Sequence, residues 1–216
     1  MRGHLVNTGV VAAPPDPVAT ELVPVGPDAL LARVGDPVAA LSLALHARAA
    51  HAPAVEIVPA AVTVLFDGVT DHDLLRSVIE RWSPSGAPAT GPVVELPTSY
   101  DGPDLEDVAR LWGTDPAGVV DRHQATTFTA AFCGFAPGFA YLTGLPVHLA
   151  VPRLDSPRTW VPVGSVALAD TWCGVYPTAS PGGWRIIGCT DVDLWDVARS
   201  KPALLAPGTR VRFVAR

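Results

Sequence analysis

Aromatic residues are concentrated in the second half of this sequence, and this uneven distribution limits the folds that the chain can adopt. Of its 6 Phe, 6 Trp and 3 Tyr residues, only Phe66 and Trp82 precede Pro97. From Thr126 onward, short β-prone runs alternate with Gly/Pro clusters, which is typical of an antiparallel barrel or sandwich. Before Pro97, short strands alternate with helical stretches, so two domains are the simpler interpretation.

The sequence before Pro97 predicts a small α+β unit. Asp36 followed by Pro37 is a helix-start signal, and Asp71 can cap a second helix that carries an apolar stripe. The elements expected in chain order are a strand at 29–34, a helix at 37–50, strands at 55–57 and 62–66, a helix at 71–82 and a last strand at 92–96. This βαββαβ order is typical of a ferredoxin-like unit, which by itself indicates no function.

We therefore expect three segments and an α+β fold class. Residues 1–20 are expected to be a flexible tail, residues 21–96 a ferredoxin-like α+β domain, and residues 97–216 an antiparallel β-barrel domain. The barrel domain is expected to begin with two short helices, near 102–113 and 116–123, because proline and acidic residues occupy their first turns.

Charge and cysteine content exclude several classes of function. The formal charge is −6 and Lys201 is the only lysine, so neither a basic nucleic-acid-binding stripe nor an upstream lysine-dependent phosphate loop is expected. The 3 cysteines show no C-x-x-C spacing, and no apolar run is long enough to span a membrane. The apolar patch near the amino terminus is too short for the core of a signal peptide. We expect a cytoplasmic protein with reduced thiols.

Three segments of the second half carry residue types suited to binding. In the first, Phe135, Phe139 and Tyr141 share parity around Pro137 and Gly138, so that a kinked loop could wall an aromatic pocket. The alternative is an ordinary core hairpin with a kinked edge.

The second segment contains Arg153 and Arg158 and continues to Ser165. A pair of guanidinium groups on a loop could hold a carboxylate or phosphate, whereas surface arginines with transient partners are the alternative. In the third, backbone amides around Gly182 and Gly183 could form an anion nest, with a plain tight turn as the alternative.

Stronger catalytic motifs are absent from the sequence. It contains no G-x-S-x-G, H-E-x-x-H, G-x-G-x-x-G or G-x-x-x-x-G-K-[ST] motif. His123 and His148 have no partner at metal-ligand spacing, so no metal site is expected. His123 is a candidate general base, and a packing or capping role at the end of its short helix is the alternative.

Taken in order, the three segments resemble one family, the KipI / PxpB proteins, also called the 5-oxoprolinase B-type subunit or allophanate hydrolase subunit 1. The family pattern reads G-F-x-P-G-F-x-Y-L, then P-R-x-x-V-P-x-G-S-V, then Y-P-x-x-S-P-G-G-W-x-x-I-G. This chain carries these patterns at Gly134–Leu142, Pro157–Val166 and Tyr176–Gly188, with Gly102–Leu105 upstream. It departs from the family at Trp172, where glutamine is common.

The resemblance implies a small α+β domain followed by a cyclophilin-like barrel, similar to the carboxyltransferase part of urea carboxylase. It implies a KipA / PxpC-type partner subunit, often with a LamB/YcsF (PxpA) type subunit, and ATP as the cofactor of the assembly, which opens 5-oxoproline to glutamate. The alternative within the same family is a regulatory module that inhibits a sensor histidine kinase.

The resemblance also implies roles for the residues of the three segments, in a barrel pocket shared with the partner. Arg153 and Arg158 would hold the substrate carboxylate or a phosphorylated intermediate, and His123 completes the catalytic candidates. The residues expected to bind substrate are Phe135, Pro137, Gly138, Phe139, Tyr141, Ser165, Tyr176, Ser180, Gly182, Gly183 and Trp184.

Overall fold

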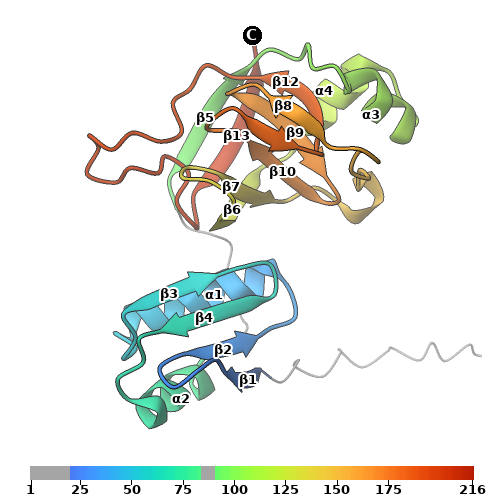
Figure 1. The fold of residues 1–216 in the computed structure, drawn as a ribbon. Coiled ribbons are helices and arrows are strands. Elements are labelled where there is room, and N and C mark those ends of the chain that lie inside the picture. Colours follow the sequence, from blue (N-terminus) through green and yellow to red (C-terminus); the bar gives the residue numbers. More distant parts are fainter. Residues whose placement is uncertain (1–19, 84–90) are drawn as a thin grey trace, which may run out of the picture.

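The computed structural model describes residues 20–83 and 91–216, which form two sheet-based units with separate hydrophobic cores (Figure 1). The first unit holds the residues before the gap, and the second holds those after it. The tail expected at 1–20 lies, apart from Thr20, outside the described residues. None of the helices in these two stretches combines the length and hydropathy that a membrane crossing requires.

The first unit is a four-stranded antiparallel sheet with two helices. Its elements in chain order are β1 (Glu21–Pro24), β2 (Leu30–Arg33), α1 (Pro37–Ala49), β3 (Glu56–Pro59), β4 (Thr63–Asp67) and α2 (His72–Glu80). The strand order is β1-β2-β4-β3. Leu30, Phe66, Leu43 and Leu75 come from the sheet and from both helices and are buried in one cluster, so the helices cover one face of the sheet.

Both helices begin where the sequence predicts. Asp36 Oδ1 accepts a hydrogen bond from the Ala39 amide at 2.7 Å, and Asp71 Oδ1 accepts one from the Leu74 amide at 2.9 Å. These side chains satisfy amides in the first turn that have no partner within the helix, which fixes each start.

The strand expected at 92–96 is present, but its assignment to this unit is wrong. β5 (Val93–Thr98) pairs in parallel with β13 (Arg210–Ala215) of the second unit. Leu96 of β5 is fully buried in the core of that second unit, so burial there determines the pairing. The order of the first unit is thus ββαββα, with β1 at the edge beside β2, and the boundary between the sheets falls before residue 93 rather than after 96.

The second unit is a nearly closed, barrel-like sheet with two helices and a short ribbon. Besides β5 and β13, its elements are α3 (Leu105–Leu111), α4 (Pro116–Ala125), β6 (Phe128–Cys133), β7 (Ala140–Thr143), η1 (Val147–Leu149), β8 (Arg158–Val161), β9 (Ser165–Ala169), β10 (Trp172–Val175), β11 (Ser180–Gly182) and β12 (Arg185–Cys189). The strand order is β12-β9-β10-β7-β6-β13-β5, and β8 pairs with β11 in a separate two-stranded ribbon.

Backbone hydrogen bonds connect the two ends of this seven-stranded sheet. Ser99, just after β5, and Cys189, at the end of β12, exchange amide–carbonyl hydrogen bonds of 2.9 and 2.8 Å. The contact nearly closes the sheet on itself. The expectation of an antiparallel barrel is wrong only at β5 and β13, which run parallel.

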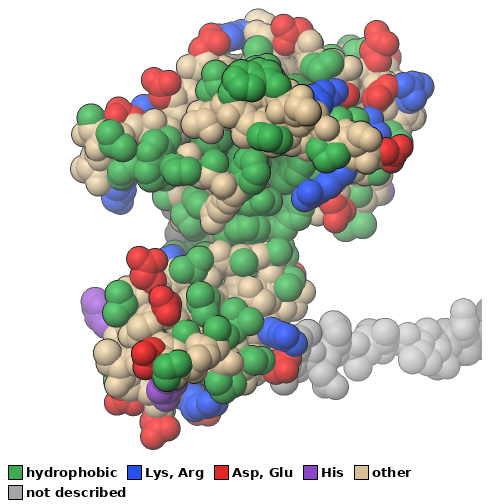
Figure 2. Space-filling view, viewed as in Figure 1, with side chains coloured by type: hydrophobic (Ala, Val, Ile, Leu, Met, Phe, Trp, Pro, Cys, Tyr) green, Lys and Arg blue, Asp and Glu red, His purple; other side chains and the backbone are tan. Residues whose placement is uncertain are grey.

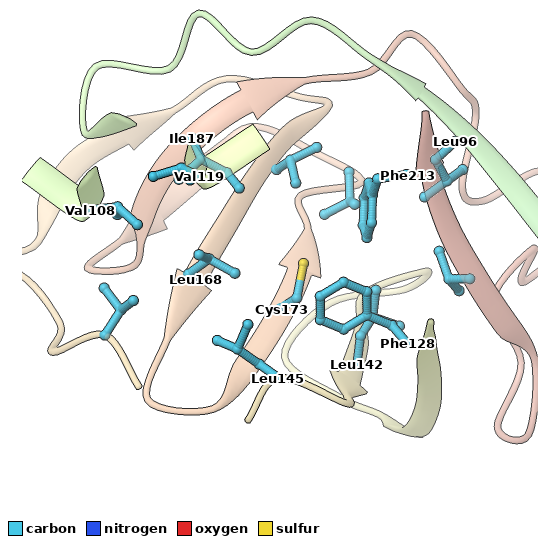
Figure 3. Packing of buried hydrophobic residues seen from close by; sticks show 14 of the residues in the cluster. Leu96, Val108, Val119, Phe128, Leu142, Leu145, Leu168, Cys173, Ile187 and Phe213 are labelled. Atoms are coloured by element: carbon cyan, nitrogen blue, oxygen red, sulfur yellow. The ribbon is translucent and has the colours of Figure 1, made fainter. Parts of the chain in front are cut away.

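The interior of the barrel is a packed core. Leu142, Leu168, Cys173 and Phe213 point into it from different strands, as Figure 3 shows, and each is at most 2 % exposed. Val108 of α3 and Val119 of α4 belong to the same cluster and lie at one end of it (Figure 3). Because side chains fill the interior, a binding site has to be sought on the outside of the sheet.

Candidate functional site

A second buried cluster lies on the outer face of the barrel sheet. Successive residues of a strand point to opposite faces; Leu168 of β9 and Cys173 of β10 belong to the interior core, whereas Ala167 and Ala169 belong to this outer cluster. Its members are Phe139, Val161, Ala167, Ala169, Tyr176, Trp184 and Ile186. Val161 comes from β8, so the β8–β11 ribbon covers the outer cluster.

The outer cluster surrounds a pocket of about 100 Å³. Its lining residues are Phe135, Phe139, Tyr141, Arg153, Tyr176, Pro181, Gly182, Gly183 and Trp184. All except Pro181 are residues that the sequence predicts for a site, and they come from all three predicted segments. The volume is below the roughly 300 Å³ at which drug-sized sites begin, so the pocket suits a small molecule or one group of a larger one.

The aromatic walls of the pocket meet edge to face. The Phe139 ring lies 5.1 Å from Tyr141, 5.4 Å from Tyr176 and 5.5 Å from Trp184, between centroids, with interplanar angles of 65–81°. These are favourable arrangements for aromatic pairs. Gly174 of β10 makes room for them, because a Cβ there would lie 2.9 Å from the Phe139 ring.

Arg153 supplies a positive charge at the pocket. Its Cζ lies 5.9 Å from the centroid of the Trp184 ring, which is cation–π geometry. Burial raises the pKa of the Tyr176 phenol, and the positive charges of Arg153 and Arg158 oppose that rise. Arg153 also lines a neighbouring hollow of about 350 Å³ with Val151 and Asp170, so this residue borders two concave surfaces.

Phe135 stands at the rim with an unusual backbone. Its φ is +70°, in the left-handed region that residues other than glycine rarely adopt, and its side chain is 62 % exposed. The ring still contacts Phe139 edge to face, with 5.3 Å between centroids. Strained residues of this kind are concentrated at functional sites, which supports a role for this loop in binding.

Several predicted residues do not line the pocket. Ser165 donates its hydroxyl hydrogen to the Pro162 carbonyl at 2.8 Å and is thereby used within its own turn. Gly138, with φ +85°, gives the chain a close approach to Trp195, and Pro137 is exposed. These residues shape the loop around the pocket rather than its surface.

His123 lies in the barrel interior and not at the pocket. Its ring centroid is 4.4 Å from that of Phe213 and 5.1 Å from that of Phe128. Nδ1 is 2.8 Å from the Tyr100 hydroxyl, and Nε2 is 3.5 Å from Cys173 Sγ. Burial lowers the pKa of His123 from 6.5 to about 3. The structure thus supports the packing alternative over the general base, because a fully buried ring cannot reach a substrate in the pocket.

Arg158 and Ser180 lie on the β8–β11 ribbon, next to the pocket but outside its lining. Arg158 Nη2 donates to Asp104 Oδ1 at 2.7 Å. Asp104 is a residue that sequence reasoning missed. The signal available for it is its place in the Gly102–Leu105 segment, but nothing local indicates a partner 54 residues away.

Trp172, the departure from the family pattern, does not close the pocket. It is half-buried beyond Tyr141, with its ring edge-on to Phe132 at 5.5 Å and to Tyr141 at 5.9 Å. Phe132 in turn stacks on Tyr141 at 4.4 Å. Trp172 therefore extends the aromatic row away from the pocket and supports Tyr141 from behind.

Comparison with known proteins identifies the family. Residues 20–205 match the family model described as carboxyltransferase domain, subdomain C and D. The chain belongs to this family. Three curated relatives, each named as the B-type subunit of 5-oxoprolinase, are 42–47 % identical to it, which confirms the predicted resemblance to KipI / PxpB proteins.

The relative from Escherichia coli O157:H7 is 47 % identical over 124 residues, covering 56 % of this chain and 57 % of that protein. The matches span a little over half the length of each of the three curated relatives. The family assignment therefore concerns this region, and the activity of the relatives as whole proteins is not carried over with it.

Solved structures of similar fold agree with the assignment. A crystal structure of TTHA0988 matches with a TM-score of 0.76 and 32 % identity, covering 88 % of this chain and 40 % of that one. The urea amidolyase of K. lactis matches with a TM-score of 0.65 at 16 % identity, covering 90 % of this chain and 15 % of that one, which shows likeness of fold alone.

Proposed function

We propose that the chain acts as the B-type subunit of an ATP-dependent 5-oxoprolinase-type complex that converts 5-oxoproline to glutamate. In this reaction water adds across the lactam C–N bond, and hydrolysis of ATP to ADP and phosphate drives the opening. The observation that carries the proposal is the convergence of the three family segments on one small pocket with aromatic walls and Arg153. Apolar walls suit a five-membered ring, and an arginine suits its carboxylate.

The proposal includes partner subunits, because the residues that line the pocket can bind a substrate but do not form a complete catalytic site. We expect a KipA / PxpC-type subunit and a LamB/YcsF (PxpA) type subunit to complete the site, to bring ATP to the complex, and to assemble in the cytoplasm. Hydrophobic side chains gather in the middle of the second unit in Figure 2. Phe135, Trp160 and Val163 are 62–65 % exposed, and burying such side chains favours association. We also propose, from the family resemblance, that the barrel is of the cyclophilin-like type.

The test is reconstitution of the activity. Glutamate release from 5-oxoproline should require ATP, this chain and both partners, and omission of this chain should abolish it. In the complete complex, Arg153→Ala should lower kcat/KM by roughly tenfold or more, the scale of one lost charged hydrogen bond. The matched control is Arg212→Ala on β13, whose guanidinium is 54 % exposed beside Glu95. If this chain and both partners assembled into a stable complex that released no glutamate from 5-oxoproline and ATP, the proposal would be overturned.

A further inference from the structure

Arg153 supplies the positive charge of the pocket from a residue that is itself exposed. Within the described stretches its guanidinium lies near the Trp184 ring but makes no hydrogen bond or ion pair. Arginine side chains have many rotamers, and ordering them costs free energy when a ligand binds. The position of the Arg153 guanidinium therefore depends on how firmly the backbone that carries it is held.

Arg185, the residue after Trp184, holds the backbone on one side of Arg153. Its Nε donates to the Pro152 carbonyl at 2.9 Å, and its Nη1 donates to Asp107 Oδ2 at 3.0 Å. The Arg185 side chain is only 16 % exposed, and hydrogen bonds from a charged donor are stronger than neutral ones. One guanidinium thus ties the Pro152 carbonyl to α3.

A second contact holds the backbone on the other side of Arg153. The Leu154 amide donates to the Gly183 carbonyl at 2.8 Å. Between the two anchors, Arg153 Cζ lies 5.9 Å from the centroid of the Trp184 ring. Residues 152, 153 and 154 therefore meet residues 185, 184 and 183 in antiparallel order, and the two anchors flank the cation–π contact at the pocket.

We propose that Arg185 is a positioning residue, which together with Asp107 fixes the backbone from which Arg153 reaches the substrate. This inference rests on the proposed function, in which Arg153 binds the carboxylate of 5-oxoproline. Arg185 lines neither the pocket nor the neighbouring hollow, so it acts through Arg153 and not on the substrate. A displacement of about 1 Å at a binding group can lower a rate by about 100-fold, so one anchor is enough to affect turnover.

The ion pairs of Asp107 allow Arg185 to be removed without leaving a buried charge. Asp107 also pairs with Arg110, three residues later on the same helix, and its side chain is 39 % exposed. Arg185→Ala therefore avoids the uncompensated buried carboxylate that makes the loss of an ion-pair partner so damaging. Arg110→Ala is the matched control, because it removes an arginine from the same carboxylate and leaves the bond to the Pro152 carbonyl in place.

The test is a double-mutant cycle in the complete complex, supplied with 5-oxoproline and ATP. Arg185→Ala should lower kcat/KM by roughly tenfold, and by no more than Arg153→Ala does, because it acts through that residue. In a chain that already carries Arg153→Ala, the second change should have almost no further effect, since the two residues form one unit. Arg110→Ala should keep the wild-type kcat/KM.

Two results would overturn the inference while leaving the proposed function intact. One is an unchanged kcat/KM in Arg185→Ala, and the other is an equal loss with and without Arg153, which is what a general structural defect produces. If Arg185→Ala does not fold, Arg185→Lys takes its place in the cycle with the same expected losses. It keeps the positive charge beside Asp107, but an ammonium group lacks the planar fork that serves both acceptors.

Hydrogen exchange in the full chain alone tests the anchor without the reaction. Arg185→Ala should speed exchange of the Leu154 amide by roughly tenfold, whereas amides on β7 keep their wild-type rates and Arg110→Ala matches wild type throughout. Unchanged exchange at Leu154 would overturn the inference. Faster exchange at Leu154 in a protein whose complete complex releases no glutamate would remove the proposed function and support Arg185 as the anchor of this segment.

Discussion

The strands β12, β9, β10 and β7 pack a hydrophobic core on their inner face and border a pocket on their outer face. The inner face carries Leu142, Leu168, Cys173 and Ile187, all fully buried in a filled core. The outer face of the same strands carries small residues and rings, and it retains a pocket of about 100 Å³ under the β8–β11 ribbon. Alternate residues of one strand thus contribute either to the core or to binding.

The small residues on the outer face explain how the pocket persists. Ala167, Ala169 and Gly174 occupy little volume, so the Phe139 and Trp184 rings can settle on the sheet and stand as walls. A core of interlocking aliphatic side chains leaves no comparable space, because interiors pack at the density of organic crystals. The comparison predicts that changes on the inner face alter stability and that changes on the outer face alter binding.

The largest expected effect concerns His123 of α4, a polar side chain that is fully buried in the barrel interior. Its folded pKa of about 3 lies below the ordinary 6.5, so protonation favours the unfolded chain. The free energy of unfolding should therefore be undiminished by this group above pH 6.5 and should fall as pH drops toward 3, by up to about 5 kcal/mol. Tyr100 and Cys173 face the ring, and burial raises the pKa of both, so neither titrates in this range.

Urea denaturation between pH 7 and pH 4 checks this prediction. His123→Gln should flatten the pH dependence, although it also lowers stability at pH 7 by disturbing the core. His148→Gln, at an exposed position on η1, should keep the wild-type slope. If His123→Gln retained the full slope, the acid sensitivity would have to come from other groups.

Two adjacent glycines provide a smaller and sharper test on the outer face. A Cβ at Gly182 would overlap the Tyr176 hydroxyl, whereas a Cβ at Gly183 would meet Pro157 at an ordinary 3.7 Å. Gly182→Ala should therefore displace Tyr176, lower the free energy of unfolding by about 1–3 kcal/mol and reduce kcat/KM roughly tenfold.

Gly183→Ala is the internal control and should stay within about 0.5 kcal/mol of wild type. Denaturation and steady-state kinetics of the complex measure both properties. Equal behaviour of the two variants would show that the ribbon adapts freely and that the pocket walls are not fixed by close packing.

Local signals predicted much of this structure. Asp36 and Asp71 cap their helices by accepting hydrogen bonds from amides only three residues later. Because both partners lie in the same short stretch of sequence, the helix starts could be predicted locally. The shared parity of Phe139 and Tyr141 likewise predicts that both rings lie on one side of an extended segment, and both line the pocket at the start of β7. Eight of the nine residues that line the pocket belong to the three segments that the sequence analysis and the family resemblance select.

Pairing between distant segments could not be predicted. β5 pairs with β13, and the paired residues are more than 100 positions apart along the chain. The sequence of Val93–Thr98 does not identify that partner strand. The Asp104–Arg158 pair spans 54 residues for the same reason. His123 is polar in the sequence, and only the closed barrel surrounds it with Phe128 and Phe213. The location of the pocket outside the barrel likewise follows from the ribbon, whose pairing depends on the complete fold.

The smallest expected effect separates stability from binding at a single outer-face residue. Phe135 holds φ at +70°, which costs a side chain roughly 1 kcal/mol or more and costs glycine almost nothing. Its ring is 62 % exposed, so little burial is lost on removal. Phe135→Gly should therefore leave the free energy of unfolding equal to wild type or raise it by up to about 1 kcal/mol, while the rim loses a wall and kcat/KM falls about threefold.

Phe135→Asn is the control, because asparagine tolerates this backbone without supplying a ring; it should show the same kinetic loss. Urea denaturation and kinetics of both variants decide the point: a Phe135→Gly protein that is clearly less stable than wild type would mean that this ring contributes to the core, and the division between the two faces would not extend to the rim.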